Sequence, residues 1–297
     1  MNLVLPEKMR PEWGVPLPAP AKINLFLHVV GRRPDGYHLL QTAFRMLARW
    51  DSLAFSPRQD GEIRLARPLP GVPEETNLCI RAARLLQAES GIRQGATISL
   101  EKRLPMGGGL GGGSSDAATV LLALNHLWET GLPRRRLMEL GLSLGADVPF
   151  FIFGKSAFAE GVGEELQPLS LPEAWYLVLE PPVSVPTAEI FSAPDLTRDT
   201  DLIKIADFPA GAGASFGPNY GRNDLEPVAC RRYPEVAEAL GWLRQFGAAR
   251  MTGSGACVFA EYASEAEARS VMPHLPKDWK AWVARSLDEH PLIGCAG

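Results

Sequence analysis

The sequence lacks the cysteine and histidine spacings that mark a zinc site or a disulfide framework. Its four cysteines lie far apart with no Cys-x-x-Cys pair, and none of its five histidines has a histidine neighbour. Either feature would need clustered ligands or paired thiols. Reduced thiols are typical of the cytoplasm, so we expect a cytoplasmic protein. The cysteines are Cys79, Cys230, Cys257 and Cys295.

Two further absences concern membranes and nucleic acids. The chain has no run of about 18 apolar residues, the length that a membrane helix requires, and Lys8 and Arg10 interrupt its N-terminal stretch. Its 30 basic and 34 acidic side chains give a net charge of -4, so it has no broad positive field for a nucleic acid backbone. We therefore expect a soluble protein that is not exported and binds neither membrane nor nucleic acid.

The composition that remains is ordinary for a folded protein. Hydrophobic residues make up 46% and charged residues 22%, which excludes disordered and fibrous classes. A chain of 297 residues tends to exceed what one core fills, so we expect two domains that meet near residues 165–175. Five prolines between residues 6 and 20 predict an irregular leader over 1–20. The predicted domains are then 21–170 and 171–297.

The first predicted strand carries an unusual pair of polar residues. Ile23 and Leu25 alternate with Lys22 and Asn24 in a strand over 21–30, and the polar face predicts something polar above it. The Gly, Ala and Pro content of 208–224 predicts a surface loop. Similar patterns predict further strands at 39–47, 52–55, 62–65, 97–101, 175–179, 257–262 and 279–285, and helices at 77–89, 114–130, 234–246 and 264–272.

A glycine-rich loop leads directly into the longest predicted helix. Six of the seven residues from 107 to 113 are glycine, and Ser114, Ser115 and Asp116 follow. Without Cβ atoms the backbone can approach phosphate oxygens, and the N-terminus of the next helix favours negative charge. A flexible linker is the alternative, but a linker rarely runs into a buried helix. We therefore predict a phosphate-binding loop.

Two better-known phosphate motifs do not fit this loop. A Walker loop requires a lysine after its last glycine, where this chain has Ser114. The spacing of Gly107, Gly109 and Gly112 matches the dinucleotide pattern, but no strand ends directly before it and no alternating βα pattern surrounds it. A nucleotide-dependent oxidoreductase therefore remains only as an alternative.

A lone acid, Asp147, lies among small and apolar residues. It either caps a helix or acts as a proton acceptor, and Lys22 alone would be read as a surface lysine. If the two face each other, the carboxylate can take a proton while the ammonium stabilises developing negative charge. The pair is what separates a catalyst from a non-catalytic nucleotide-binding module.

Three other segments have less certain roles. Tyr37 and His38 follow a Pro-Asp-Gly turn and offer a stacking ring and a hydrogen-bonding ring. Gly253 and Gly255 belong to a second glycine-rich turn, which is either a tight hairpin or another anion-binding surface. The arginines at 134–136 open a helix, and we expect them on a solvated face.

A family resemblance rests on four segments that occur in order along the chain. They read PAKINLFLHVVGRRPDGYHLLQT, LPMGGGLGGGSSDAA, LGADVPFFIFGKSAFAEGVGE and MTGSGAC. Together they resemble the 4-diphosphocytidyl-2-C-methyl-D-erythritol kinases, a family of the galactokinase, homoserine, mevalonate and phosphomevalonate (GHMP) kinase superfamily. The resemblance extends from about residue 20 to residue 285.

The resemblance implies an α+β fold of two domains with the active site between them. The N-terminal kinase domain would contain a left-handed β-α-β crossover, and the C-terminal domain would be ferredoxin-like. The implied reaction transfers the γ-phosphoryl group of ATP, with Mg²⁺, to the 2-hydroxyl of a CDP-linked alcohol in the non-mevalonate route to isoprenoid precursors. Alternatives are another small-alcohol kinase, such as a mevalonate kinase, or the oxidoreductase.

The resemblance also implies roles for individual residues. Lys22 and Asp147 correspond to the catalytic pair, and Gly253 and Gly255 are assigned to the substrate site. The ATP phosphate loop would comprise Pro105, Met106, Gly107, Gly108, Gly109, Leu110, Gly111, Gly112, Gly113, Ser114 and Ser115. Substrate positions would be Asn24, Tyr37, His38, Thr187 and Phe191. The metal ligands stay unassigned, with Ser114 or Ser115 as the only candidates, and either a monomer or a homodimer is compatible with the sequence.

Overall fold

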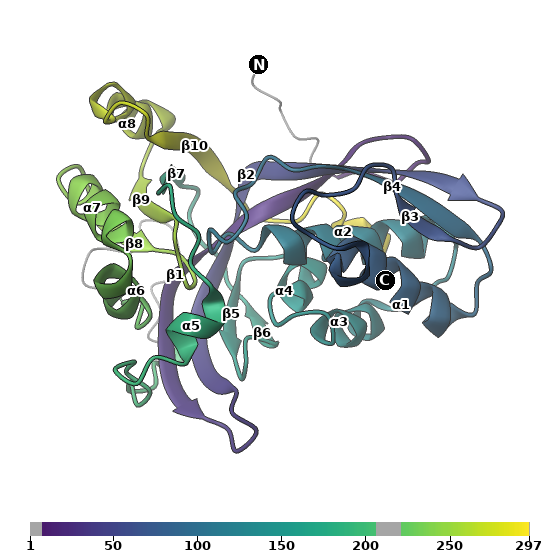
Figure 1. Cartoon of the computed structure of the whole chain (residues 1–297), viewed down its shortest axis with the longest axis horizontal. Helices are drawn as coiled ribbons and strands as arrows, with labels where there is room; N and C mark the ends of the chain where they lie inside the picture. Colours follow the sequence, from purple (N-terminus) through teal and green to yellow (C-terminus); the bar gives the residue numbers. More distant parts are fainter. Residues whose placement is uncertain (1–7, 206–220, 297) are drawn as a thin grey trace.

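A mixed β-sheet runs through the protein and joins two groups of helices (Figure 1). The structure is a computed structural model that describes residues 8–205 and 221–296. The central path of the sheet is β3-β4-β2-β10-β7-β9-β8, with β1 and β5 also paired to β2 and β6 paired to β5. Helices α1 to α4 lie toward one end of this sheet, and α6, α7 and α8 lie toward the other (Figure 1).

The longest strands form an antiparallel hairpin, β1 (Leu17–Arg32) and β2 (His38–Arg58). The predicted leader is too long, because β1 begins at Leu17 and not at residue 21. Proline has no N–H group to donate, but over this stretch β1 pairs with β2 on one side only. Pro18 and Pro20 are therefore tolerated, because their nitrogen atoms can point to the unpaired side of the strand. The predicted strands 39–47 and 52–55 are one strand, β2.

The N-terminal half adds a parallel strand pair to this hairpin. Strands β3 (Ile63–Leu65) and β4 (Gly95–Glu101) are parallel neighbours, joined through the 3-10 turn Glu74–Thr76 and α1 (Leu78–Ser90). The Asn77 side chain caps α1 by accepting from the Cys79 amide at 2.9 Å, and Gly91 ends the helix with φ 70°. Both ends of this helix are confirmed. The parallel pair and α1 form a β-α-β crossover, whose left-handedness stays a prediction.

Three helices and a short hairpin complete this half. They are α2 (Gly112–Leu127), α3 (Arg134–Leu142), α4 (Val148–Phe153), β5 (Ala157–Glu160) and β6 (Glu165–Pro168). Helix α2 starts two residues earlier than predicted and is buried over most of its length. The prediction of a solvated face at 134–136 is wrong for Arg134. Its guanidinium is half-buried and donates to the carbonyl of Ala296 at 2.7 Å, which ties α3 to the C-terminus.

The C-terminal half has a ferredoxin-like order of elements. Its strands follow the sheet order β10-β7-β9-β8, all antiparallel neighbours, with helices in the two crossovers. This order agrees with the predicted domain type. The elements are β7 (Trp175–Glu180), α5 (Thr187–Phe191), α6 (Glu226–Arg232), α7 (Pro234–Leu243), β8 (Ala249–Met251), β9 (Val258–Tyr262), α8 (Glu265–Ser270), the 3-10 turn Met272–His274, β10 (Lys280–Leu287) and the 3-10 turn Ile293–Cys295.

Segments near both ends of the chain contribute residues to the core of the opposite half. Leu27 and Val29 of β1 pack in the core of the C-terminal half, while Leu292 and Cys295 pack in the core of the N-terminal half. Strand β10 also pairs with both β7 and β2. The division at residue 170 stays a prediction, and these crossings mean that neither part is built from one continuous segment.

Some predictions fall on the part of the chain that is not described. Most of the predicted loop at 208–224 lies outside the described residues, which resume at residue 221. Within 8–205 and 221–296, no helix has the length and apolar character needed to cross a bilayer.

Candidate active site

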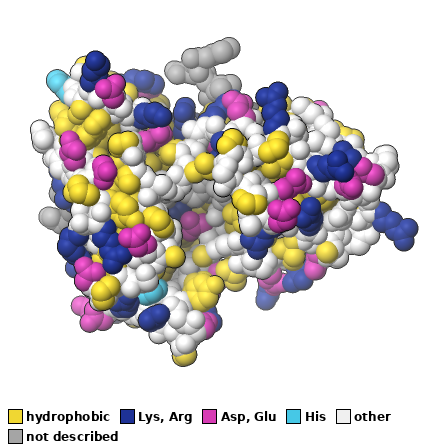
Figure 2. All heavy atoms as spheres, in the orientation of Figure 1, with side chains coloured by type: hydrophobic (Ala, Val, Ile, Leu, Met, Phe, Trp, Pro, Cys, Tyr) yellow, Lys and Arg dark blue, Asp and Glu magenta, His cyan; other side chains and the backbone are white. Residues whose placement is uncertain are grey.

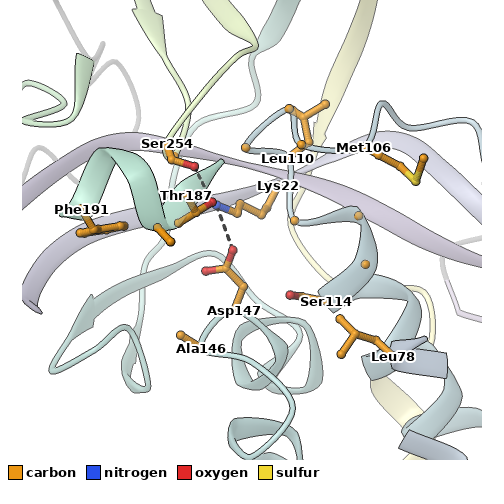
Figure 3. Close-up of a pocket in the computed structure, with 18 of the residues that line it drawn as sticks. Lys22, Leu78, Met106, Leu110, Ser114, Ala146, Asp147, Thr187, Phe191 and Ser254 are labelled. Carbon is orange, nitrogen blue, oxygen red and sulfur yellow. Dashed lines mark hydrogen bonds and ion pairs between the residues drawn. The ribbon is translucent and has the colours of Figure 1, made fainter. Parts of the chain in front are cut away.

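A pocket of about 920 Å³ lies where the two halves meet. Figure 2 shows the surface hollowed between the two ends of the molecule, and Figure 3 shows side chains that line a pocket there. The lining comes from β1, the glycine loop, the N-terminus of α2, the loop before α4, and α5. Every predicted site residue lines it except Ser115 and Gly255.

Lys22 and Asp147 face each other across this pocket (Figure 3). The Lys22 ammonium Nζ is 3.2 Å from Asp147 Oδ2 and donates to Asn24 Oδ1 at 2.7 Å. The Lys22 side chain is only 4% exposed, so the surface-lysine alternative is wrong. The Asp147 side chain is 32% exposed and can meet a ligand in the pocket.

Asp147 does not cap the helix that it precedes. It stands at the N-cap position of α4, but its side chain accepts no capping hydrogen bond. The alternative reading of this residue as a helix cap is therefore wrong. Its carboxylate is directed at Lys22 and the pocket instead (Figure 3).

The glycine loop turns its carbonyl groups away from the pocket and onto neighbouring elements. The carbonyls of Gly107 and Gly108 accept from the amides of Ala256 and Cys257 at 3.2 Å, and that of Leu110 accepts from the Lys22 amide at 2.9 Å. No amide of residues 107–111 donates to another group that the structure describes. Because carbonyls repel anions and amides attract them, this arrangement suits a phosphate.

Glycine at position 109 is required by both conformation and packing. Gly109 has φ +73°, and a Cβ there would lie 2.1 Å from the carbonyl oxygen of Thr252. The two glycine-rich turns of the chain therefore pack backbone against backbone. A side chain would separate them, whatever ligand the loop binds.

Thr252 connects three of the segments that the sequence analysis identified. Its hydroxyl accepts from the Asn24 amide at 3.0 Å and donates to the Gly109 carbonyl at 3.3 Å. Asn24 in turn donates from Nδ2 to Thr42 Oγ1 at 2.9 Å while its Oδ1 accepts from Lys22. The second glycine-rich turn thus holds β1 and the first glycine loop together.

The two predicted residues outside the pocket are turned toward the protein interior. Ser115 lies on the face of α2 that packs into the core and is fully buried. Gly255 has φ +91°, and a Cβ there would meet Met251 Sδ at 2.8 Å. Of the second turn, Gly253 and Ser254 line the pocket, and Ser254 Oγ is 2.8 Å from Thr187 Oγ1.

The other end of the pocket is formed by aromatic and polar side chains from the turn before β2, the first residue of β2 and the last residue of α5. Tyr37 is 64% exposed and lines the pocket. The rings of His38 and Phe191 lie 5.0 Å apart between centroids. Burial, together with the nearby charges of Arg198 and Arg32, lowers the pKa of His38. A planar ligand can stack among these side chains.

Comparisons with known proteins agree with this architecture. The family model described as GHMP kinases N terminal domain matches residues 77–155, and that described as GHMP kinases C terminal matches 205–281. A 4-diphosphocytidyl-2-C-methyl-D-erythritol kinase of Aromatoleum aromaticum is 62% identical over 280 residues, covering 94% of this chain and 96% of the relative. This chain belongs to the 4-diphosphocytidyl-2-C-methyl-D-erythritol kinase family.

Other similar proteins extend the comparison to the fold of this kinase. A relative of the same description in Thiobacillus denitrificans is 63% identical, covering 93% of this chain and 96% of its own. A crystal structure of 4-(cytidine 5'-diphospho)-2C-methyl-D-erythritol kinase is 38% identical with a TM-score of 0.79, covering 92% of this chain and 99% of that one. Homoserine kinase from Cytophaga hutchinsonii, at 17% identity and a TM-score of 0.71, shares the fold. The predicted family and α+β GHMP fold are confirmed.

Sequence reasoning missed a buried charge cluster beside the glycine loop of this kinase. Lys102 binds Asp51 and also lies 2.7 Å from Asp116, while Asp51 Oδ1 accepts from the Leu104 amide at 2.8 Å. Burial raises the pKa of Asp116 to about 7, against the opposing effect of Lys102. Lys102 and Asp116 line the pocket. The sequence offers one sign of this cluster, because Lys102 precedes the glycine run and Asp116 follows it.

Proposed function

We propose that the protein transfers the γ-phosphoryl group of ATP to the 2-hydroxyl of 4-diphosphocytidyl-2-C-methyl-D-erythritol. The products are the 2-phosphate and ADP, in isoprenoid precursor biosynthesis by the methylerythritol phosphate pathway. Membership of the family, at about 62% identity to a relative of that description, supports the reaction. The observation that carries the site is the Lys22–Asp147 pair, 3.2 Å apart, beside a loop whose carbonyls turn away from the pocket.

In this proposal the glycine loop and α2 hold the phosphates of ATP. The free amides of 107–111 and the N-terminus of α2 stabilise the negative charge of the transferred group. Phosphoryl transfer depends mainly on alignment and charge stabilisation, which fixed amides provide without rearrangement. The adenine would lie toward the apolar side chains at that end of the pocket, among them Leu78, Leu100 and Met106.

Asp147 and Lys22 act on the acceptor hydroxyl. The hydroxyl oxygen forms the new bond to the γ-phosphorus, the bond from phosphorus to the ADP oxygen breaks, and the hydroxyl proton moves to the Asp147 carboxylate. The Lys22 ammonium, held by Asn24, stabilises the oxygen as its negative charge develops. Both groups reach the same part of the pocket, so one hydroxyl can contact both.

The donor set at the phosphate end is compatible with Mg²⁺. The described residues contain no group of three or more His, Cys, Asp or Glu side chains suited to a metal ion, so phosphate oxygens would have to complete the coordination. The Ser114 hydroxyl is directed toward the loop that carries Asp147 (Figure 3). Ser114 and Asp147 would hold the ion, and bound Mg²⁺ would neutralise phosphate charge. Ser115 is buried away from the pocket and does not fit this role.

The aromatic end of the pocket, here called the cytidine end, favours a substrate that carries a base over the small alcohols of related kinases. Mevalonate and homoserine carry no base, whereas Tyr37, His38 and Phe191 form an open aromatic site beyond the reacting groups. Thr187, hydrogen-bonded to Ser254, lies between the two ends. No feature of this site favours the alternative of a nucleotide-dependent oxidoreductase.

A coupled assay of ADP release tests the proposal. Purified protein with ATP and Mg²⁺ is offered the CDP-linked alcohol, mevalonate or homoserine at equal concentration. We expect turnover only with the CDP-linked alcohol, and phosphorus NMR should place the new phosphate on the 2-hydroxyl. Preferred turnover of mevalonate or homoserine would refute the assignment. We further propose a cytoplasmic enzyme whose site needs no second chain, whether it is a monomer or a homodimer.

A further inference from the structure

Among the described residues, strand β1 has a partner strand on one edge only, and three distant pieces of chain cover its other edge. The paired edge belongs to β2. On the other edge the Lys22 amide donates to the first glycine loop, and the Asn24 amide donates to the Thr252 hydroxyl. Further along, the Leu27 amide donates to the Arg222 carbonyl at 2.9 Å. These covering groups therefore hold the strand that carries Lys22 and Asn24.

The third piece is the segment 222–224, which lies parallel to β1 at Leu27. The Asp224 amide donates to the Leu27 carbonyl at 2.8 Å. The Asp224 carboxylate accepts from the Val29 amide at 2.8 Å. Main-chain and side-chain bonds thus fix this segment to the same edge of β1, just beyond Asn24.

The side chain of Asn223 joins this segment to the second glycine-rich turn. Its Nδ2 donates to the carbonyls of Met251 and Gly253, both at 2.8 Å, and its Oδ1 accepts from the Leu225 amide at 3.0 Å. Asn223 is only 3% exposed and does not line the pocket. Both N–H groups and the carbonyl of its carboxamide are therefore used inside the protein. No other side chain of this size offers two donors beside an acceptor.

The second glycine-rich turn needs a support from outside because of its own composition. It contains Gly253 and Gly255, at φ +55° and +91°, and glycine gives the backbone little conformational preference of its own. Thr252 lies between the two carbonyls that Asn223 holds. Its hydroxyl is the group that contacts β1 and the first glycine loop. Asn223 therefore fixes the backbone on both sides of that hydroxyl.

We propose that Asn223 is a positioning residue for phosphoryl transfer, which fixes Thr252 and through it the strand that carries Lys22. Transfer tolerates little displacement, since a shift of about 1 Å in a reacting group can lower the rate by about 100-fold. Asn223 would act without touching any ligand, because it does not line the pocket. The inference rests on the proposed function, because it takes Lys22 as a group that acts on the acceptor hydroxyl.

The decisive experiment compares Asn223→Asp with the wild type as full-length protein. The carboxylate keeps the shape of the side chain but places an oxygen against the carbonyls of Met251 and Gly253, to which it cannot donate. We expect kcat for the CDP-linked alcohol to fall by about 10- to 100-fold, because alignment is lost. The KM for ATP should change by less than about threefold, because many groups share in binding. The Asn24 amide resonance in ¹H–¹⁵N spectra should shift, because its acceptor moves.

The matched control is Asn125→Asp, near the C-terminus of α2 and outside the pocket lining. Asn125 is 4% exposed and likewise donates to two backbone carbonyls, those of Leu132 at 3.2 Å and Cys295 at 3.4 Å. Its Oδ1 accepts from the Leu132 amide at 3.0 Å. This variant should lower the melting temperature, as Asn223→Asp does. It should keep kcat within about twofold of the wild type and leave the Asn24 resonance in place.

A second variant, Asn223→Ser, covers the case in which Asn223→Asp fails to fold. Serine introduces no charge and retains one donor, so this protein should fold and lose kcat by only about three- to tenfold. A folded Asn223 variant with the kcat and the Asn24 resonance of the wild type would overturn the inference.

Two further outcomes separate stability from positioning and the inference from the proposed function. Equal losses of kcat in Asn223→Asp and Asn125→Asp would overturn the inference, because both residues would then contribute stability alone. Absence of turnover by the wild type with the CDP-linked alcohol would instead refute the proposed function. The Asn24 resonance would still report in that case whether Asn223 positions β1, because it requires no substrate.

Discussion

The two ends of the pocket are built by opposite means. At the phosphate end the ligand would meet main-chain amides of a loop that is held in place because the carbonyls of Gly107, Gly108 and Leu110 accept hydrogen bonds from neighbouring segments. At the cytidine end it would meet side chains, of which Tyr37 is 64% exposed. The first end is fixed by contacts among strands and turns far apart in the sequence, and the second is formed by side chains of the turn before β2, the start of β2 and the end of α5.

The difference indicates which step each end serves. Phosphoryl transfer requires atoms aligned to within fractions of an ångström, which buried backbone can provide. Recognition of a base tolerates adjustment, because stacking depends on ring area more than on exact position. Substitutions at the phosphate end should therefore change kcat or stability, and those at the cytidine end should change KM for one substrate.

The largest effect is expected for Asp147→Asn at the phosphate end. The amide keeps the size of the side chain but cannot take the hydroxyl proton, so kcat should fall by roughly 10²- to 10⁴-fold. The KM for ATP should change little. Steady-state kinetics with each substrate varied in turn measures both values, and Asp60→Asn, in the exposed turn before β3, is the control. Near-normal turnover would remove Asp147 from the chemistry.

Thr252→Val should lower kcat by about 10- to 100-fold although Thr252 does not line the pocket. Valine has nearly the same shape but cannot accept from the Asn24 amide or donate to the Gly109 carbonyl. Two buried groups lose their partner, so the free energy of unfolding should fall by about 1–3 kcal/mol as well. Rates and thermal denaturation are measured on the same preparation.

Thr119→Val is the matched control for this substitution. Thr119 is also fully buried, but it lies in α2 and donates only to the Pro18 carbonyl at 3.4 Å. It should lower stability without a specific effect on kcat. Equal rate losses in both variants would mean that Thr252 contributes stability alone.

At the cytidine end, Tyr37→Ala should raise the KM for the CDP-linked alcohol by about 5- to 150-fold. That range corresponds to the loss of one stacked ring, about 1–3 kcal/mol. Because the side chain is 64% exposed, the melting temperature and the KM for ATP should stay nearly constant. Tyr37→Phe keeps the ring and should behave almost as the wild type. A fall in ATP affinity would place the base elsewhere.

The same contrast explains which parts of the site could be predicted from the sequence. Period-two alternation placed Lys22 and Asn24 together on one strand face, and the glycine run predicted the loop before α2. Both signals are local in the chain. The catalytic pair could be proposed but not established, because the 3.2 Å contact joins residues 22 and 147 through tertiary structure alone.

What was missed depends on burial by distant segments. Asp51 falls between the predicted strands 39–47 and 52–55, yet it lies within β2, where it binds Lys102 and the backbone at residue 104. Arg134 was expected on a solvated face for the same reason, since two of its three carbonyl partners, Ile293 and Ala296, lie near the end of the chain and the third, Ile152, lies in α4. A single charged residue gives no local sign that a partner some 50 to 160 positions away will bury it.

The smallest effect is expected from Gly113→Ala, and it separates two functions of the glycine run. Gly113 lies in the first turn of α2 without a positive φ, and a Cβ there would meet only Leu78 Cδ1, at an ordinary 3.5 Å. Alanine should therefore fold and leave the melting temperature unchanged or slightly higher, since it restricts the unfolded chain. The added methyl group narrows the approach of phosphate to the helix N-terminus, so the KM for ATP should rise about two- to tenfold. Gly109→Val is the contrasting variant: its side chain would collide with the Thr252 carbonyl at a φ of +73°, so it should lose stability and both substrate affinities together. An unchanged KM for ATP in a folded Gly113→Ala protein would show that phosphate contacts the loop before residue 113 and not the first turn of α2.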